Sequence, residues 1–235
     1  KKIGMKEEVS VPGIALPHGA YPHALIHGNL LFLSGVGPRE ADSISFSDVF
    51  EVQCEKVLDN VEAVLAYVLK NHGDIAKIRL VNVVTYFIDL RRREYFETEF
   101  AKRFPDEAPV LSYENVAALP GAIQIEMKVI GEITRHDATE VSTDLVFVGG
   151  DQSGDPPAGF NKQFDFVLES LESDLERQGL ELSNLLDVEV YMTDLKNDWR
   201  PYNEAYSKCF RLASRPVRTT IGVKGLPHEW TVQIK

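Results

Sequence analysis

The chain has 235 residues, of which 44% are hydrophobic, and a formal net charge of −11. This length suits one large domain or two small ones, and the acidic balance excludes general nucleic-acid binding, because phosphate backbones require clustered positive charge. No apolar run approaches the ~18 residues of a membrane span, the first residues lack the apolar stretch of a signal peptide, and Cys54 and Cys209 fit no metal or disulfide spacing. We therefore expect a soluble protein of a reducing compartment, the cytoplasm.

The first half of the chain predicts a strand, a helix, a strand, a helix and a strand. In the first helix, Val57, Val61, Val64 and Val68 recur at spacings of three and four, which is typical of a helix with one apolar face. The predicted elements, in chain order, are 30–35, 48–69, 78–90, 93–104 and 123–129.

The last of these strands alternates strictly between apolar and polar residues. Ile125 and Met127 point one way, and Gln124, Glu126 and Lys128 point the other. A one-faced sheet covered by two helices is an α+β layer. The polar face of the strand then either meets solvent or lines a cleft between subunits.

The second half of the chain repeats the first. PVLSYENVAALP (109–120) returns as PVRTTIGVKGLP (216–227), and four further segments match in the same order: LVFVGG (145–150), FNKQFDFVLESLESDLERQGL (160–180), LLDVEVYMTDL (185–195) and RPYNEAYSKCF (200–210). The last residues, TVQIK, match the strand IQIEMKV, so we expect the natural chain to continue beyond residue 235. Six matching segments in the same order indicate a tandem duplication. We predict two units, residues 1–134 and 135–235, that pack closely because no linker separates them.

The motifs of both copies resemble the reactive intermediate deaminase (RidA, formerly YjgF) family. They are Tyr-Pro-His-Ala before a strand that ends in Ser-Gly, a strand that ends in Asp-Leu, Tyr-Asn-Glu-x-Tyr, Pro-x-Arg-[ST] and Leu-Pro. The resemblance covers nearly all of both copies. The Tyr-Pro-His-Ala and Leu-Pro-His elements are most similar to the 2-aminomuconate deaminase branch.

The resemblance implies two chorismate-mutase-like units, each a mixed β-sheet with two helices on one face. Such units form trimers with clefts at their interfaces, so we expect a homo-oligomer, with a trimer as the first candidate. The implied activity is hydrolysis of an imine or enamine of a small carboxylated substrate to a carbonyl compound and ammonia, with no metal or organic cofactor, no nucleic acid and no membrane as partner.

The family's two charged site residues fall in different copies. The arginine that holds the substrate carboxylate is Leu111 in the first copy and Arg218 in the second. The glutamate associated with the water is Glu126 in the first copy and Gln233 in the second. A guanidinium can hold a carboxylate through two parallel hydrogen bonds, and Glu126 can act as acid or base according to its pKa.

The remaining site positions divide in the same way. The N-terminal tyrosine is Tyr21 and corresponds to Arg135 in the second copy. Ser34-Gly35 becomes Gly149-Gly150, and Asn203 of the second copy corresponds to Glu97 of the first. We therefore hypothesise one composite site at an interface between the copies, with Glu126, Tyr21 and Ser34 as catalytic residues. Arg218, Asn203, Gly35 and Thr219 would bind the substrate, and backbone amides near 34–35 or 219–221 would steady developing charge.

Other interpretations of these residues remain open. Arg218 alone could form a surface ion pair, Glu126 could be solvated, and Tyr21 could simply pack. The histidines, among them His18, His23, His27 and His228, lack a second cluster that would complete a metal set, so we expect no metal site. A non-catalytic module that binds a small carboxylate is the second functional hypothesis; a ribonuclease and a chorismatase-like hydrolase are less favoured.

Overall fold

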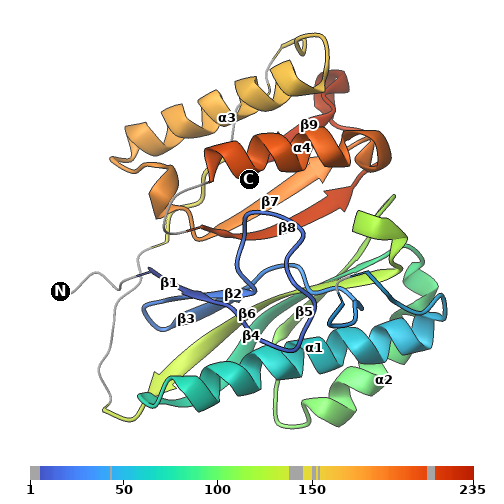
Figure 1. Cartoon of the computed structure of the whole chain (residues 1–235), viewed down its shortest axis with the longest axis vertical. Coiled ribbons are helices and arrows are strands. Elements are labelled where there is room, and N and C mark those ends of the chain that lie inside the picture. The colour runs from blue at the N-terminus through green and yellow to red at the C-terminus, as the bar shows by residue number, and fades with distance from the viewer. Residues whose placement is uncertain (1–5, 43, 138–144, 150–151, 153, 211–214) are drawn as a thin grey trace.

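The structure is a computed structural model that describes residues 6–42, 44–137, 145–149, 152, 154–210 and 215–235. Its two sheets lie face to face in the middle, and a pair of helices covers the outer side of each (Figure 1). Two tandem α+β units, each a mixed sheet with two helices on one face, are therefore confirmed. The division at residues 134 and 135 stays a prediction; the last strand of the first unit runs to Arg135.

The first unit has a six-stranded sheet in the order β1-β2-β3-β6-β4-β5, covered by α1 and α2. Its strands are β1 (Lys6–Val9), β2 (Ala24–His27), β3 (Leu30–Leu33), β4 (Ile75–Phe87), β5 (Val110–Asn115) and β6 (Ile125–Arg135), and its helices are α1 (Phe50–Asn71) and α2 (Arg93–Arg103). The valines predicted to form one face of the first helix are all buried in the core of this unit. Three strands, β1, β2 and β5, were not predicted.

The second unit has a three-stranded sheet in the order β8-β7-β9, covered by α3 and α4. Its elements are α3 (Phe160–Arg177), β7 (Asp187–Met192), α4 (Leu195–Cys209), β8 (Val217–Gly222) and β9 (Val232–Ile234). The strand predicted at 145–150 is wrong for residues 145–149, which lie in no strand; residue 150 lies outside the described residues. In the first unit the corresponding strand, β3, pairs with β2 and with residues 130–132 of β6. In the second unit the strand that corresponds to β6 is β9, which is too short to pair with residues 145–149 in the same way.

Strand register shows which positions of the two units correspond. In the first unit Leu111 pairs with Val83 of β4, and Glu126 pairs with Tyr86. In the second unit Arg218 pairs with Val188 of β7, and Gln233 pairs with Tyr191, three residues further along in both cases. The equivalence of Leu111 with Arg218, and of Glu126 with Gln233, is thus structural as well as sequential.

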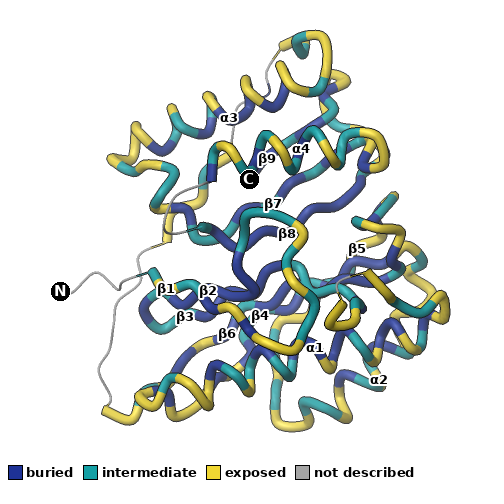
Figure 2. Tube along the Cα trace, in the orientation of Figure 1, coloured by how far each residue is buried: buried dark blue, intermediate teal, exposed yellow. Residues whose placement is uncertain are grey.

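One face of β8 packs against the first unit. Val217 packs with Leu25 and Phe32 of the first unit, and Ile221 packs with a first-unit cluster that includes Tyr86 and Ile123. The backbone contributes as well: the amide of Gly222 donates to the carbonyl of Ala118 at 2.8 Å. Figure 2 shows the result as a band of buried chain where the two sheets face each other.

Candidate functional site

A cavity of about 100 Å³ lies at the junction of the two units. The first unit contributes the loop 14–18, the end of β3 and the start of β6, and the second unit contributes α4 and β8. Arg218 and Glu126, which come from different units, both line it.

Arg218 projects from β8 into a cage of aromatic rings. Its guanidinium carbon lies 4.3 Å from the ring centroid of Tyr21, 4.9 Å from that of Tyr206, 5.0 Å from that of Tyr202 and 5.4 Å from that of Trp199. The residue is only 3% exposed. Such faces stabilise a desolvated cation but leave its N–H donors without an anionic partner.

A neutral acceptor on α4 helps to orient the Arg218 guanidinium. Nη1 donates to Oδ1 of Asn203, one helical turn from Trp199 on α4, at 2.8 Å. The first-unit loop also approaches closely, since a Cβ atom added to Gly19 would come within 3.0 Å of Nη1 and of Nη2. The guanidinium is therefore held in place by groups from both units.

The backbone of Arg218 is fixed by the end of β3. Its carbonyl accepts from the amide of Gly35 at 3.0 Å, and its amide donates to Oγ of Ser34 at 3.2 Å. The Ser34 hydroxyl in turn donates to the carbonyl of Pro22 at 2.6 Å. Ser34 thus acts on Arg218 as a positioning residue, and the Gly35 amide is already bonded and does not serve as a free donor for developing charge.

Glu126 lies on the face of β6 that turns away from the first unit's core. Because the second unit covers this face, Glu126 is only 6% exposed. The alternative interpretation, that its side chain is solvated, is therefore wrong. Burial raises the pKa of its carboxyl to about 8, although the charges of Arg218 and Arg39 oppose that shift. No hydrogen bond or ion pair to this carboxyl forms within the described part of the chain.

A glycine makes room for the Glu126 carboxyl. A Cβ atom at Gly35 would lie 2.1 Å from Oε1 of Glu126, far inside contact distance. Gly35 therefore does two things: its amide holds β8, and its missing side chain leaves space for the acid.

Tyr21 reaches the cavity on the loop between β1 and β2, which crosses the junction of the units (Figure 1). His23 braces this loop: its Nδ1 accepts from the amide of Val11 at 2.9 Å, so its Nε2 carries the proton and donates to the carbonyl of Ala15 at 2.9 Å. Both ring nitrogens of His23 are thus committed to the loop, and burial lowers its pKa.

Two expected substrate-binding residues do not line the cavity. Thr219 is buried on the opposite face of β8, because side chains alternate along a strand, and the hydroxyl that lines the cavity belongs to Thr220. Asn203 lies behind Arg218 and touches its guanidinium.

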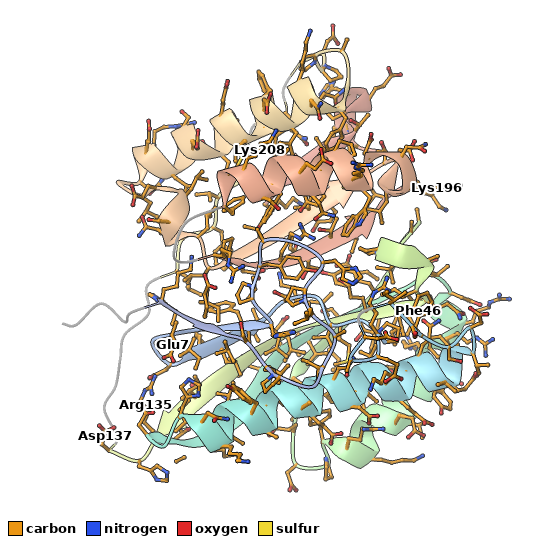
Figure 3. All side chains as sticks on the ribbon, viewed as in Figure 1. Glu7, Phe46, Arg135, Asp137, Lys196 and Lys208 are labelled. Atoms are coloured by element: carbon orange, nitrogen blue, oxygen red, sulfur yellow. The ribbon has the colours of Figure 1, made fainter. Side chains whose placement is uncertain are left out.

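The residues that correspond to Arg218, Asn203 and Tyr21 in the other copy do not line the cavity. Leu111 sits on β5 and is 36% exposed, while Glu97 pairs with Arg93 on α2. The alignment of Arg135 with Tyr21 is wrong: Arg135 ends β6 of the first unit and forms an ion pair with Asp74. Figure 3 shows Arg135 at the far end of that unit, away from Lys196 and Lys208 on α4.

Several residues that line the cavity or surround Arg218 were not predicted as site residues. Arg39 follows the Ser-Gly motif of the first copy, and Asn60 lies on the buried face of α1. Trp199, Tyr202 and Tyr206 recur at spacings of three and four on α4, a pattern that also fits an ordinary helix core. Only the tertiary structure shows that this aromatic stripe surrounds a charge.

The described residues hold no group of three His, Cys, Asp or Glu side chains placed to bind a metal ion. Among the helices that the structure describes, none is long and apolar enough to span a membrane.

One protein family matches this chain along most of its length. The family described as Endoribonuclease L-PSP matches residues 13–133 and again 136–235. A RutC family protein of Aquifex aeolicus is 34% identical over 85 residues, which are 36% of this chain and 67% of the relative. Reactive Intermediate Deaminase A of Arabidopsis thaliana, a chloroplastic protein, is 31% identical over 129 residues, 54% of this chain and 66% of the relative.

Among solved structures, the yeast protein YEO7 aligns with 55% of this chain and 98% of its own, at 27% identity and a TM-score of 0.48. Two successive matches to one family model, on a fold of two similar units, identify the chain as a member of the Endoribonuclease L-PSP family, which belongs to the RidA/YjgF superfamily.

Proposed function

We propose that the chain hydrolyses an imine or enamine of a small carboxylated substrate to a carbonyl compound and ammonia. One observation carries the proposal: a single cavity holds a buried, unpaired guanidinium from one unit and a carboxyl with a raised pKa from the other. The name of the Arabidopsis relative, a reactive intermediate deaminase, supports the same reaction class. The narrower expectation, a substrate like 2-aminomuconate, belongs to this class.

Each group has a defined part in the reaction. Arg218 binds the substrate carboxylate with donors that its aromatic cage leaves free. Glu126, which is protonated near neutral pH, donates its proton to the imine nitrogen. The resulting carboxylate takes a proton from the water that adds to the carbon. Glu126 then passes this proton to the nitrogen of the carbinolamine and accepts the hydroxyl proton as the C–N bond breaks, which releases ammonia and the carbonyl compound.

The arrangement also explains why few groups suffice. A free imine already hydrolyses in water, so orientation of the substrate against one acid supplies much of what is needed. Tyr21 closes the cavity over the Arg218 guanidinium, and Ser34 and Asn203 hold that guanidinium in position.

A coupled assay tests the proposal. An amino-acid oxidase generates 2-imino acids, and semicarbazide traps what the protein leaves behind. We expect turnover by the wild type that is lost in Arg218→Met and in Glu126→Gln, and retained in the matched variants Leu111→Met and Gln233→Ala at the corresponding positions of the other unit.

Other outcomes would redirect the assignment. Turnover that survives Arg218→Met would show that another group holds the carboxylate. A folded wild type that turns over no member of a panel of imines would overturn the deaminase and favour a module that binds carboxylates without chemistry.

A further inference from the structure

The arginines of the chain divide into two groups. Every described arginine outside the cavity forms an ion pair with a carboxylate: Arg79, Arg91, Arg92, Arg93, Arg103, Arg135, Arg177, Arg200 and Arg215. Arg39 and Arg218 are the described arginines that form none, and both line the same cavity. In a chain of net charge −11, two unpaired cations at one place indicate a site for anions.

Arg39 is held in place by neutral groups. Its Nη1 donates to the carbonyl of Ile44 at 3.1 Å, and its guanidinium carbon lies 5.2 Å from the ring centroid of Phe46, which Figure 3 labels at the loop beside α1. A Cβ atom at Gly121 would lie 1.8 Å from Nη2, so this guanidinium occupies space that only glycine leaves. A guanidinium has five N–H donors, and these contacts do not use them all.

The backbone that carries Arg39 is also fixed. The buried side-chain amide of Asn60 donates to the carbonyl of Gly37 at 2.9 Å and to that of Arg39 at 3.1 Å. Such a double contact from a helix core is a feature of a built site. The second copy has Gly154 at the position of Arg39 and cannot supply this cation.

The charges in the cavity do not balance. Glu126 is the acidic residue among the described side chains that line it, and its raised pKa keeps it largely neutral near pH 7. Both Arg39 and Arg218 act electrostatically on its carboxyl, so both cations lie near the acid. Apolar walls, formed by Ile14, Val36 and Ile123, complete the cavity.

We propose that the substrate carries two carboxylates, one bound by Arg218 and the other by Arg39, joined by a short carbon chain that packs against the apolar wall. This inference rests on the proposed function for the reaction and adds the substrate class. Arg39 is then a specificity-determining residue of the first unit, as Arg218 is the anchor of the second.

The test compares two substrates of equal chain length. Glutamate and norvaline, each oxidised by a suitable amino-acid oxidase, provide 2-iminoglutarate with two carboxylates and 2-iminopentanoate with one. We expect the wild type to favour 2-iminoglutarate in kcat/KM by about 10- to 100-fold, the worth of one charge-assisted contact. In Arg39→Gln this ratio should fall close to one, whereas Arg91→Gln, a change at an exposed surface arginine, should keep the wild-type ratio.

Calorimetric binding of the two oxo acids separates this inference from the proposed function. If neither imine is turned over, but 2-oxoglutarate binds more tightly than 2-oxopentanoate and Arg39→Gln removes the difference, the dicarboxylate site stands and the deaminase assignment fails. A wild type without preference in turnover or binding, or a preference that survives in Arg39→Gln, would overturn the dicarboxylate site. Thermal unfolding of each variant confirms that it is folded.

Discussion

Strands β5 and β8 hold the same place in the two units, but their surroundings differ completely. Each runs parallel to its neighbour with an equivalent register, yet β8 is buried along its whole length, whereas Val110 of β5 is 64% exposed. The end of β3 and the loop before β2 cover β8, and no described segment covers β5 in that way. A duplicated strand therefore becomes a site only where the other unit encloses it.

The comparison extends to the neighbouring strands. Lys128 of β6 is buried between the units and pairs with Asp187 at 2.6 Å and Glu189 at 2.5 Å, while its counterpart Lys235 is exposed. Burial alone would lower the pKa of Lys128, but the two carboxylates of β7 more than offset this and raise it. The lysine at this position thus joins the two units through ion pairs in one copy and lies at the surface in the other.

The largest loss of stability should follow from removing the ion pairs of Lys128. Lys128→Met leaves Asp187 and Glu189, whose side chains are 18% and 25% exposed, without their cation, which should cost about 3–5 kcal/mol in the free energy of unfolding. Lys235→Met should change it by less than about 0.5 kcal/mol. Urea unfolding measures both, and equal effects would show that these ion pairs do not hold the units together.

Arg218→Met should abolish most activity without unfolding the protein. Loss of the carboxylate anchor should lower kcat/KM by about 100-fold, while the free energy of unfolding should be unchanged or higher, because a buried cation without an anion is costly. Leu111→Met, at the equivalent site of β5, should alter neither. Loss of stability in Arg218→Met would mean that the aromatic cage stabilises the fold through this charge.

Gly35→Ala should show how much the space beside Glu126 matters, with Gly149→Ala, at the position of Ser34 in the second copy, as a control. A methyl group at Gly35 collides with Glu126, so we expect a loss of about 1–3 kcal/mol in unfolding free energy together with lower activity. At Gly149 the nearest atom to such a methyl is 4.0 Å away, and the change should be nearly neutral. Unchanged stability and activity in Gly35→Ala would show that the Glu126 side chain can move away from the added methyl group.

Ser34→Ala removes a hydroxyl that joins the units. The amide of Arg218 and the carbonyl of Pro22 would both lose a partner, which should cost about 1–2 kcal/mol. KM should rise more than kcat falls, because Ser34 positions Arg218 and does not react with the substrate. Ser173→Ala, on the exposed face of α3, serves as the control. A fall in kcat alone would instead place Ser34 in the chemistry.

The last expected effect is a slope of stability with pH. Between the ordinary value of 4.5 and about pH 8, folded Glu126 keeps a proton that the unfolded chain has lost, so stability falls as pH rises, by at most about 1.4 kcal/mol per pH unit. Glu126→Gln should remove this slope, and Glu176→Gln should not. Urea unfolding at several pH values measures it, and identical slopes in wild type and Glu126→Gln would show that Glu126 is ionised in the fold.

Much of the fold could be predicted because it follows from local patterns. The periodic valines of α1 and the alternation of β6 reflect the geometry of single elements, and both are observed. The prediction failed at 145–149, where strand formation depends on a partner that the pattern of the segment does not contain. Thr219 and Arg135 were misplaced because a motif gives the identity of a residue but not the face on which it lies.

The sequence by itself determined that the chain is a duplication, which positions correspond, and that the arginine and the glutamate were kept in different copies. These properties depend on order and spacing along the chain. The tertiary structure decided that Arg218 and Glu126 share one cavity, that Arg39 joins them, and that β5 stays open. The physical reason is desolvation: the burial that raises the pKa of Glu126 and encloses the Arg218 guanidinium arises only when the surface of one unit covers the other.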